Sequence, residues 1–287
     1  MVERPGSRPS KPADANSGLT ATVTGMSAQH DPAKHDPAKH DPATHDPATH
    51  DPAENNAAIW TDQRQVADWV ATSAERERTR SVHRQVMVEL LPFDEADNFT
   101  FVDLGAGTGA ASRAVLDHFA NAQAVLADFS PQMMSEGNAA LAGYEGRYRY
   151  VTMDLEQPGW PGDLPTPADA VISSLCVHHV PDERKRQLFS EICNNLAPGG
   201  WYLNYDPVGA TSPEIADAWQ RAGDRRDPSA AATRANRTPE QLKRWENHIR
   251  YISPLEPQLR WLEEAGFDAV DVYWKDLDNA IFGGRRP

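Results

Sequence analysis

The segment from Phe101 to Ala110 constrains the fold of this chain more than any other. It reads Phe-Val-Asp-Leu-Gly-Ala-Gly-Thr-Gly-Ala, a short apolar run that contains an acid and is followed by alternating glycines. Glycines at 105, 107 and 109 permit a tight turn without Cβ atoms, so a ligand can lie against the backbone near the start of the next helix. Asp103 can accept a hydrogen bond from an ammonium group. The segment therefore predicts a strand, a ligand-binding turn and a helix.

Around this segment, short apolar or β-branched runs alternate with longer helical patterns. This alternation indicates βαβ units and a mainly parallel sheet. The predicted strands are 100–104, 124–128, 148–153, 170–175, 201–205, 269–274 and 279–282. The predicted helices are 110–119, 131–141, 183–196 and 255–265, the last ended by Gly266 as a C-terminal cap.

The first 56 residues differ from the rest in composition. They are rich in Pro, Ala, Asp, Ser and Thr, and His30 to Ala53 repeats His-Asp-Pro-Ala-(Lys/Thr). So few apolar side chains cannot offset the entropy lost on ordering, which predicts a disordered tail. The regularly spaced imidazoles are possible metal ligands, but a flexible repeat implies no fixed ligand geometry, and a solvated tail is the favoured interpretation.

Two further segments are predicted to cover the sheet. Residues 57–94 have apolar spacings typical of two amphipathic helices that end before Pro92, and Arg76, Arg80 and Arg84 share one stripe that could meet an anionic substrate. Residues 211–253 interrupt the strand–helix alternation with polar, Arg-rich sequence, including helical patterns at 213–222 and 239–249. An insertion after a late strand lies over the carboxyl edge of the sheet, so a helical lid or acceptor pocket is expected.

Charge and cysteine usage narrow the class of protein. The chain has a formal charge of −14, and residues 57–287 carry 23 Lys and Arg against 34 Asp and Glu. Such an acidic body disfavours nucleic acid as a partner. Cys176 and Cys193 stand in apolar surroundings that suit a reducing compartment, and we find no signal peptide or membrane-spanning run. A cytoplasmic protein is expected; its oligomeric state does not follow from the sequence.

The glycine pattern alone leaves the ligand open, because Gly105, Gly107 and Ala110 also satisfy a dinucleotide-binding fingerprint. Asp128, which ends the second predicted strand, can accept both hydroxyls of a ribose, a feature shared by NAD and adenosyl cofactors. Four further segments narrow the choice. They are 127–133 (Ala-Asp-Phe-Ser-Pro-Gln-Met), 153–156 (Met-Asp-Leu-Glu), 169–179 (Asp-Ala-Val-Ile-Ser-Ser-Leu-Cys-Val-His-His) and 196–200 (Leu-Ala-Pro-Gly-Gly).

Together, in this order, these motifs resemble those of the class I S-adenosylmethionine-dependent methyltransferases, across residues 95–287. The resemblance implies a Rossmann-like seven-stranded sheet of order 3-2-1-4-5-7-6, with an antiparallel last strand and helices on both faces. It also implies a small-molecule acceptor and methyl transfer to O, N or C by in-line displacement.

The resemblance assigns roles to individual residues. Gly105, Gly107 and Gly109 would hold the methionine side of the cofactor, with Asp103 near its amino group, and Asp128 would take the ribose. Phe129 and Met133 would pack on the adenine, Asp154 would accept from its exocyclic amine, and Leu155 would meet the ring. Ser173 or Ser174 would offer backbone carbonyls.

A general base is useful where the acceptor is a hydroxyl, a phenol or an acidic carbon, and His is the usual choice. His178 and His179 follow the fourth predicted strand and are the candidate bases, although a structural role in the turn before Pro181 is an equal alternative. No protein metal site is predicted. Second-rank candidates near the acceptor are Trp60, Tyr205, Asp206, Trp219, Trp245, His248 and Tyr251.

Other functions remain open from sequence. A nicotinamide-dependent reductase would share the strand, the glycine loop and the acid, but the chain has no Tyr-x-x-x-Lys pair. Methylation of nucleic acids is disfavoured, because the fourth strand ends in Ser-Ser-Leu-Cys and not in the Asn/Asp-Pro-Pro-Tyr/Phe of base-amino methyltransferases. Methylation of proteins is disfavoured, because no two-glutamate loop like that of protein arginine methyltransferases follows. A noncatalytic adenosyl-binding module is the third alternative.

Overall fold

A seven-stranded sheet organises the computed structural model, which describes residues 60–287 except for the side chains of 73–79 and Glu240. The predicted tail, residues 1–56, lies outside this range, as does its repeat. The strands are β1 Thr100–Leu104, β2 Gln123–Asp128, β3 Tyr148–Thr152, β4 Ala168–Ser174, β5 Leu196–Pro207, β6 Asp268–Asp276 and β7 Asn279–Arg285.

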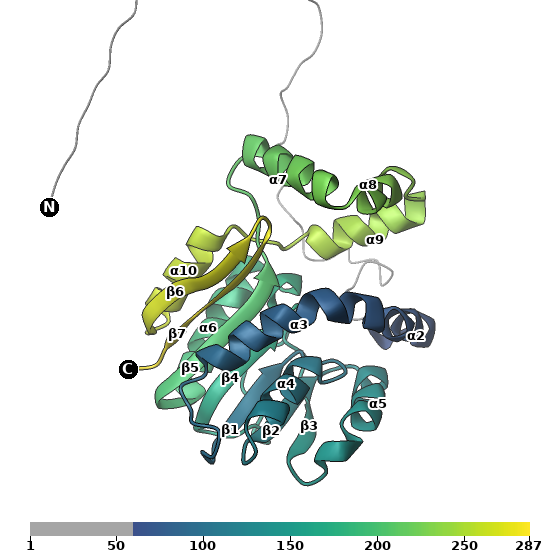
Figure 1. Cartoon of the computed structure of the whole chain (residues 1–287). Coiled ribbons are helices and arrows are strands. Elements are labelled where there is room, and N and C mark those ends of the chain that lie inside the picture. The colour runs from purple at the N-terminus through teal and green to yellow at the C-terminus, as the bar shows by residue number, and fades with distance from the viewer. Residues whose placement is uncertain (1–59) are drawn as a thin grey trace, which may run out of the picture. The chain divides into compact units, whose positions relative to one another are not determined.

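The strand order is β3-β2-β1-β4-β5-β7-β6 (Figure 1). The first five strands pair in parallel, whereas β7 is antiparallel to both β5 and β6. This arrangement confirms the predicted sheet order and its antiparallel last strand. Because β1 and β4 are adjacent and the chain leaves them toward opposite sides of the sheet, a crevice forms at their carboxyl ends.

Helices cover both faces of the sheet and bury two apolar cores. On one face, α3 (Ser73–Leu90) and α4 (Ala110–His118) pack with Phe101, Leu126 and Ile172. On the other face, α6 (Asp182–Asn195) and α10 (Leu255–Glu264) pack with side chains that alternate with those, such as Val102 and Val171. This period of two places every central strand between two apolar layers, as expected for parallel strands.

Two helices border the β3 edge of the sheet. α5 (Pro131–Ala140) begins after Ser130, whose hydroxyl accepts a hydrogen bond from the Met133 amide, and Pro131 occupies the first turn. α2 (Gln63–Ala71) begins after Asp62, whose carboxylate accepts from two amides of the first turn, and it contacts both α3 and α5. The segment before the sheet is therefore helical, as its apolar spacing predicts.

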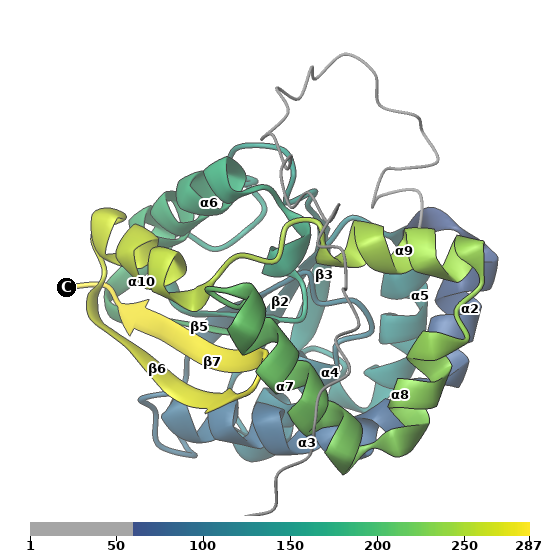
Figure 2. The ribbon, with the colours of Figure 1, turned by 90° about the horizontal axis from the view of Figure 1, so that it is seen from above.

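The insertion forms three helices, α7 (Pro213–Arg226), α8 (Pro228–Ala235) and α9 (Pro239–Ile249). They lie above the ends of the parallel strands in Figure 1 and form an arc in Figure 2. α7 extends four residues beyond its predicted end, and α8 is absent from the prediction, because its Ala-rich turns have no apolar period. Each helix starts with a proline after a Ser, Asp or Thr cap, which explains their sharp boundaries.

Strand boundaries differ most from prediction at β5 and β7. β5 begins at Leu196, five residues before the predicted start, and its pairing with β4 shifts register between Leu196 and Trp201. β7 continues three residues beyond Phe282 to Arg285, which pairs with Trp201. Across residues 60–287, no helix combines the length and the apolar character needed to cross a bilayer.

Candidate functional site

A cavity of about 990 Å³ lies at the carboxyl ends of β1, β2 and β4. Its wall combines the glycine loop after β1, the ends of β2 and β4, and residues of α2, α3 and α9. A volume of this size accommodates a cofactor together with part of a second small ligand. Ten of the eleven predicted cofactor residues line it: Asp103, Gly105, Gly107, Gly109, Asp128, Phe129, Met133, Asp154, Leu155 and Ser174.

The glycines of the loop meet different requirements. All three have positive φ, from +54° at Gly107 to +74° at Gly109, in the left-handed region that favours glycine. A Cβ at Gly105 would lie 1.9 Å from the sulfur of Cys176, and one at Gly109 would lie 2.6 Å from Leu141. A Cβ at Gly107 would meet no atom of residues 60–287 within 4 Å. Gly105 and Gly109 are thus required by packing, whereas Gly107 leaves open space beside the backbone.

The backbone of Gly107 is held from two sides. Its amide donates to Asp128 Oδ2 at 2.7 Å, and its carbonyl accepts from the Tyr150 hydroxyl at 2.9 Å. Gly137 allows this approach, because a Cβ there would lie 1.8 Å from the Tyr150 oxygen. The loop is therefore fixed by side chains of β2 and β3. No local sequence pattern points to Tyr150, because it is separated from Gly107 by more than forty residues.

Asp103 is buried at the base of the loop. Its Oδ2 accepts from the amide and the hydroxyl of Ser112, at 3.2 and 2.7 Å, while Oδ1 has no hydrogen-bond partner among the described residues. Burial raises the pKa of Asp103 to about 7, against the opposing bonds from Ser112, and the nearby Asp128 raises it further. An unpaired, buried carboxylate oxygen at a cavity wall suits a cationic partner.

Asp128 ends β2 and is also nearly buried, at 7% exposure. Its Oδ1 accepts from the Ser130 amide at 2.8 Å. Burial raises the pKa of Asp128, although the bonds from the Ser130 and Gly107 amides act in the opposite direction. The carboxylate therefore performs two visible structural tasks: it holds the backbone at Ser130, just before α5, and it holds the glycine loop.

The loop after β3 lies beside this site. Asp154 Oδ1 accepts from the Glu156 amide at 2.9 Å, and the Leu155 carbonyl accepts from Arg184 Nε at 2.8 Å. Arg184 is itself paired with Glu191 on α6. These bonds anchor the loop to α6 while Asp154 and Leu155 still face the cavity.

The two candidate serines at the end of β4 differ in position. Ser173 is fully buried, its hydroxyl donates to the Leu104 carbonyl at 2.9 Å, and it does not line the cavity. Ser174 is partly exposed and lines the cavity wall. Successive residues of a strand point to opposite faces, so the structure brings only Ser174 to the site.

His178 and His179 lie in a 3-10 turn, η3 (Val177–His179), that follows β4. His178 is buried, its amide donates to Asp206 Oδ2 at 2.9 Å, and its Nδ1 lies 2.7 Å from Asp206 Oδ1. This bond orients the ring with Nε2 away from Asp206, and Nε2 has no partner among the described residues. Both histidines line the cavity, and Asp206 positions the first of them.

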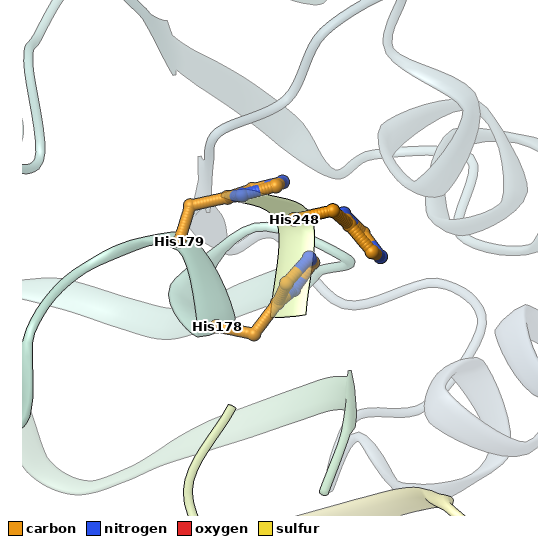
Figure 3. Close-up of side chains that lie close together, drawn as sticks. All are labelled: His178, His179 and His248. Carbon is orange, nitrogen blue, oxygen red and sulfur yellow. The ribbon is translucent and has the colours of Figure 1, made fainter. Parts of the chain in front are cut away.

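His248 of α9 joins this pair (Figure 3). Its ring centroid lies 4.9 Å from that of His178 and 5.3 Å from that of His179. Burial lowers the pKa of His179 well below its usual value, and the neighbouring His178 and His248 lower it further. Burial, His178 and Arg80 lower the pKa of His248 to about 4, although Asp206 opposes the shift. Both rings are thus neutral at neutral pH.

The second-rank candidates divide into two groups. Trp60 lines the cavity, and its ring centroid lies 6.2 Å from that of His179 in an edge-on contact. Of the predicted arginine stripe, Arg80 and Arg84 of α3 also line the cavity, whereas the side chain of Arg76 is outside the described residues. Tyr205 instead stacks on His83 beneath α3. The others do not line the cavity: Trp219 lies beneath Lys275, Trp245 beneath Arg237, and Tyr251 near Lys185.

Comparison with known proteins gives the class to which this fold corresponds. Residues 101–200, about a third of the chain, match a family model described as a methyltransferase domain. This match confirms the predicted resemblance from β1 to the first part of β5, a span that includes the glycine loop, Asp128, Asp154 and the paired histidines. No curated protein sequence matches the chain significantly.

Solved structures share the fold at low sequence identity. An O-methyltransferase family protein from Burkholderia thailandensis is 19% identical with a TM-score of 0.59, over 82% of this chain and 63% of that one. The pyocyanin biosynthetic protein PhzM is 16% identical with a TM-score of 0.55, over 80% and 62%.

Human N-acetylserotonin methyltransferase, solved in complex with SAM, is 15% identical with a TM-score of 0.53, over 80% of this chain and 58% of that one. This chain therefore spans less than two thirds of the length of each of these proteins. The likeness establishes the fold as that of the class I methyltransferases.

Proposed function

We propose that this protein is an S-adenosylmethionine-dependent methyltransferase that acts on a small molecule. One observation carries the proposal: a single cavity joins the glycine loop and Asp128 to the paired histidines after β4. A donor held at the loop would thus face an acceptor beside the histidines. The match of residues 101–200 to a methyltransferase domain supports this function over a nicotinamide-dependent reductase.

The residues present fit the cofactor. The unpaired Oδ1 of Asp103 suits the cofactor's ammonium, and the open space beside Gly107 lets the methionine portion approach the backbone. Asp128 has two carboxylate oxygens for the ribose hydroxyls. Phe129 and Met133 offer apolar contacts to the adenine, with Asp154, the Leu155 amide and the Ser174 carbonyl at its edge.

Charge complementarity supports the same assignment. The bound cofactor supplies an activated methyl group on a positively charged sulfur. Asp103, Asp128, Glu136 and Asp154 all line the cavity, so the wall nearest the loop offers carboxylates to a cation. An acidic body and this cationic cofactor are compatible, whereas a polyanionic acceptor such as nucleic acid would be repelled.

Positioning of the acceptor supplies much of the rate in a displacement of this kind. The Nε2 of His178 can accept a proton from an acceptor hydroxyl, since Asp206 holds Nδ1 and stabilises the charge that develops on the ring. His179 is the second candidate base, with a neutral ring at the cavity wall. We propose that α2, α7, α8 and α9 form the lid over the acceptor.

Calorimetric titration with S-adenosylhomocysteine tests the cofactor assignment. Asp128→Ala removes the ribose ligand and one support of the glycine loop, so we expect at least about a 100-fold loss of affinity, close to 3 kcal/mol. Asp163→Ala, at an exposed position between β3 and β4, is the matched control and should bind as the wild type does. Equal affinity of the Asp128 variant and the wild type would overturn the assignment.

Transfer of a labelled methyl group into the small-molecule fraction of a cell extract tests the activity itself. We expect label in a molecule of low mass, and none in protein or nucleic acid. Binding of S-adenosylhomocysteine without any transfer would instead favour a noncatalytic adenosyl-binding module.

A further inference from the structure

Three histidines from two distant segments converge at the cavity wall. His178 and His179 come from η3 and His248 from α9, and one ring nitrogen of each can be chosen so that all three lie within 4.8 Å of one another (Figure 3). The ring centroids of His178 and His179 are 3.9 Å apart. Each neutral imidazole carries a lone pair on one nitrogen, so three rings this close together can offer three nitrogen ligands to one ion.

A metal ion binds the neutral form of histidine, through the lone pair of one ring nitrogen. Each of the three rings can offer one such nitrogen, and the two residues of η3 hold theirs next to that of His248 on α9.

The surroundings of His178 supply an independent observation. Its ring is 3% exposed, Nδ1 is bonded to Asp206, and Nε2 has no partner among residues 60–287. A carboxylate that holds one imidazole nitrogen while the other stays available is the usual outer arrangement around a metal-bound histidine. Asn204 also donates to Asp206, at 3.3 Å, which helps to fix the carboxylate.

We propose that His178, His179 and His248 bind one divalent transition metal ion, with Asp206 as the outer ligand of His178. Three imidazoles favour Zn²⁺ or a similar ion over Mg²⁺ or Ca²⁺, which prefer oxygen ligands. A tetrahedral ion with Zn–N distances near 2.0–2.1 Å needs nitrogens about 3.4 Å apart, so small ring rotations suffice. The site departs from the sequence-based expectation of no metal.

The three ligands leave a fourth position open. All three histidines line the cavity, so we infer that this position faces the acceptor. On the proposed methyltransferase function, on which this inference rests, a metal ion there would bind the hydroxyl oxygen of the acceptor and lower the pKa of that hydroxyl, so that its proton passes to water and not to a histidine base. The acceptor class is then a small molecule with a metal-binding hydroxyl or phenol, whose oxygen keeps a lone pair for the methyl group. Since His248 belongs to the insertion, the same ion would tie α9 to the sheet edge.

Metal titration of the full chain, made without a polyhistidine tag, tests the site. Because the tail contributes His30, His35, His40, His45 and His50, these five are replaced by Gln in the background used for all variants. We expect one equivalent of Zn²⁺ by calorimetry, and with Co²⁺ the strong visible absorption of a four- or five-coordinate ion.

His248→Ala should weaken binding by about 100-fold or more and abolish the Co²⁺ spectrum, since two ligands hold a metal poorly. His118→Ala, at an exposed position on α4, is the matched control and should leave both unchanged. Although the His248 ring packs against His178 and His179, the residue as a whole stays exposed to solvent, so the substitution should preserve the fold; His248→Gln provides a second variant of similar size. Equal Zn²⁺ affinity in the wild-type and His248 variants, or no Co²⁺ spectrum, would overturn the site.

The two proposals fail separately. Zn²⁺ binding that depends on His248, in a protein with no affinity for S-adenosylhomocysteine, would support the metal site and refute the proposed function. Methyl transfer by a protein that takes up no Zn²⁺ or Co²⁺ would do the reverse.

Discussion

The two sides of the cavity are built differently. The cradle, which we define as residues 103–109, 128–133 and 154–155, is held by hydrogen bonds to neighbouring strands and helices. The cover, defined as Trp60 with α2, α7, α8 and α9, lines the cavity through Trp60, α2 and α9; it has no fully buried residue in α7 or α8, and it exposes Leu242 and Trp245. Few buried contacts make local opening less costly, so the cover is the side expected to move.

This difference indicates a division of labour. A cofactor of fixed structure is best held by a fixed framework, where each donor and acceptor is already oriented. An acceptor must enter and leave, and specificity is commonly carried by segments that vary on a rigid scaffold. Substitutions in the cradle should therefore change cofactor affinity, and substitutions in the cover should change the response to the acceptor.

The largest effect is expected within the glycine loop. Gly107→Ala places a methyl group in open space where we propose that the cofactor lies, so affinity for S-adenosylhomocysteine should fall by about 100-fold, while the positive φ costs only about 1–2 kcal/mol of stability. Gly105→Ala clashes with Cys176, so it should reduce both affinity and the yield of folded protein.

Calorimetry and thermal unfolding measure these two quantities. Gly143→Ala, whose added Cβ meets no atom within 4 Å and whose φ is not positive, is the control. If Gly107→Ala bound as tightly as Gly143→Ala, the loop would not be the cofactor cradle.

The cradle is also the part that sequence predicts well, for a physical reason. Its signals are local: three glycines within five residues fix the turn, and an acid at a strand end fixes the next loop. The sheet order likewise follows from short apolar runs that alternate with helices. Ser173 and Ser174 show the limit of local patterns. Successive side chains of a strand face opposite sides of the sheet, so the Ser173 hydroxyl faces away from the cavity and donates to the Leu104 carbonyl.

The acceptor side depends on contacts that no local pattern encodes. His248 lies about seventy residues after His179, and the packing of α9 brings the two together. Asp206 ranks only second among the predicted candidates, because its bond to His178 joins residues that lie 28 positions apart in the sequence. The prediction started β5 too late, because residues 197–200 have the composition of a turn. In the structure the strand already begins at Leu196, which pairs with Ala168 of β4.

The next effect concerns Asp206, which orients His178 at the wall of the same cavity. Asp206→Asn keeps the size of the side chain but removes the negative charge that stabilises the oriented ring. We expect kcat for methyl transfer to fall between about 10- and 100-fold, with affinity for S-adenosylhomocysteine unchanged. The kcat–pH profile should also change shape, which a purely structural defect would not produce. A parallel loss of cofactor affinity would show that Asp206 supports the cradle instead.

A smaller effect is expected from pH, acting within the cradle. The ligand-free pKa of Asp103 is about 7, so the carboxyl is largely neutral at pH 6 and ionised at pH 8. Only the ionised form attracts the ligand's ammonium. Affinity for S-adenosylhomocysteine should therefore rise about tenfold from pH 6 to pH 8. Asp103→Asn should bind weakly, with no such dependence.

The same raised pKa has the opposite effect on stability: as pH rises, ligand affinity increases but the free energy of unfolding decreases. Because the folded protein holds the Asp103 proton more tightly than the unfolded chain, the wild type loses free energy of unfolding as pH rises from about 4 to about 7. Asp103→Asn lacks this loss, so its stability relative to wild type should improve across the window, as denaturant titrations can measure. A constant difference between the two proteins would contradict the raised pKa.

The smallest effect comes from comparing a tryptophan at the cavity wall, Trp60, with one on the outer surface of the cover, Trp245. Trp60 lines the cavity beside His179, whereas Trp245 is 37% exposed beneath Arg237. An aromatic contact contributes about 0.5–1.5 kcal/mol beyond its area, so Trp60→Ala should raise the acceptor KM about fivefold. Trp245→Ala should leave it unchanged. Steady-state kinetics at saturating cofactor, with the acceptor found by methyl labelling, measure both. If Trp60→Ala instead weakened the binding of S-adenosylhomocysteine and left the acceptor KM unchanged, Trp60 would belong to the cradle and not to the cover.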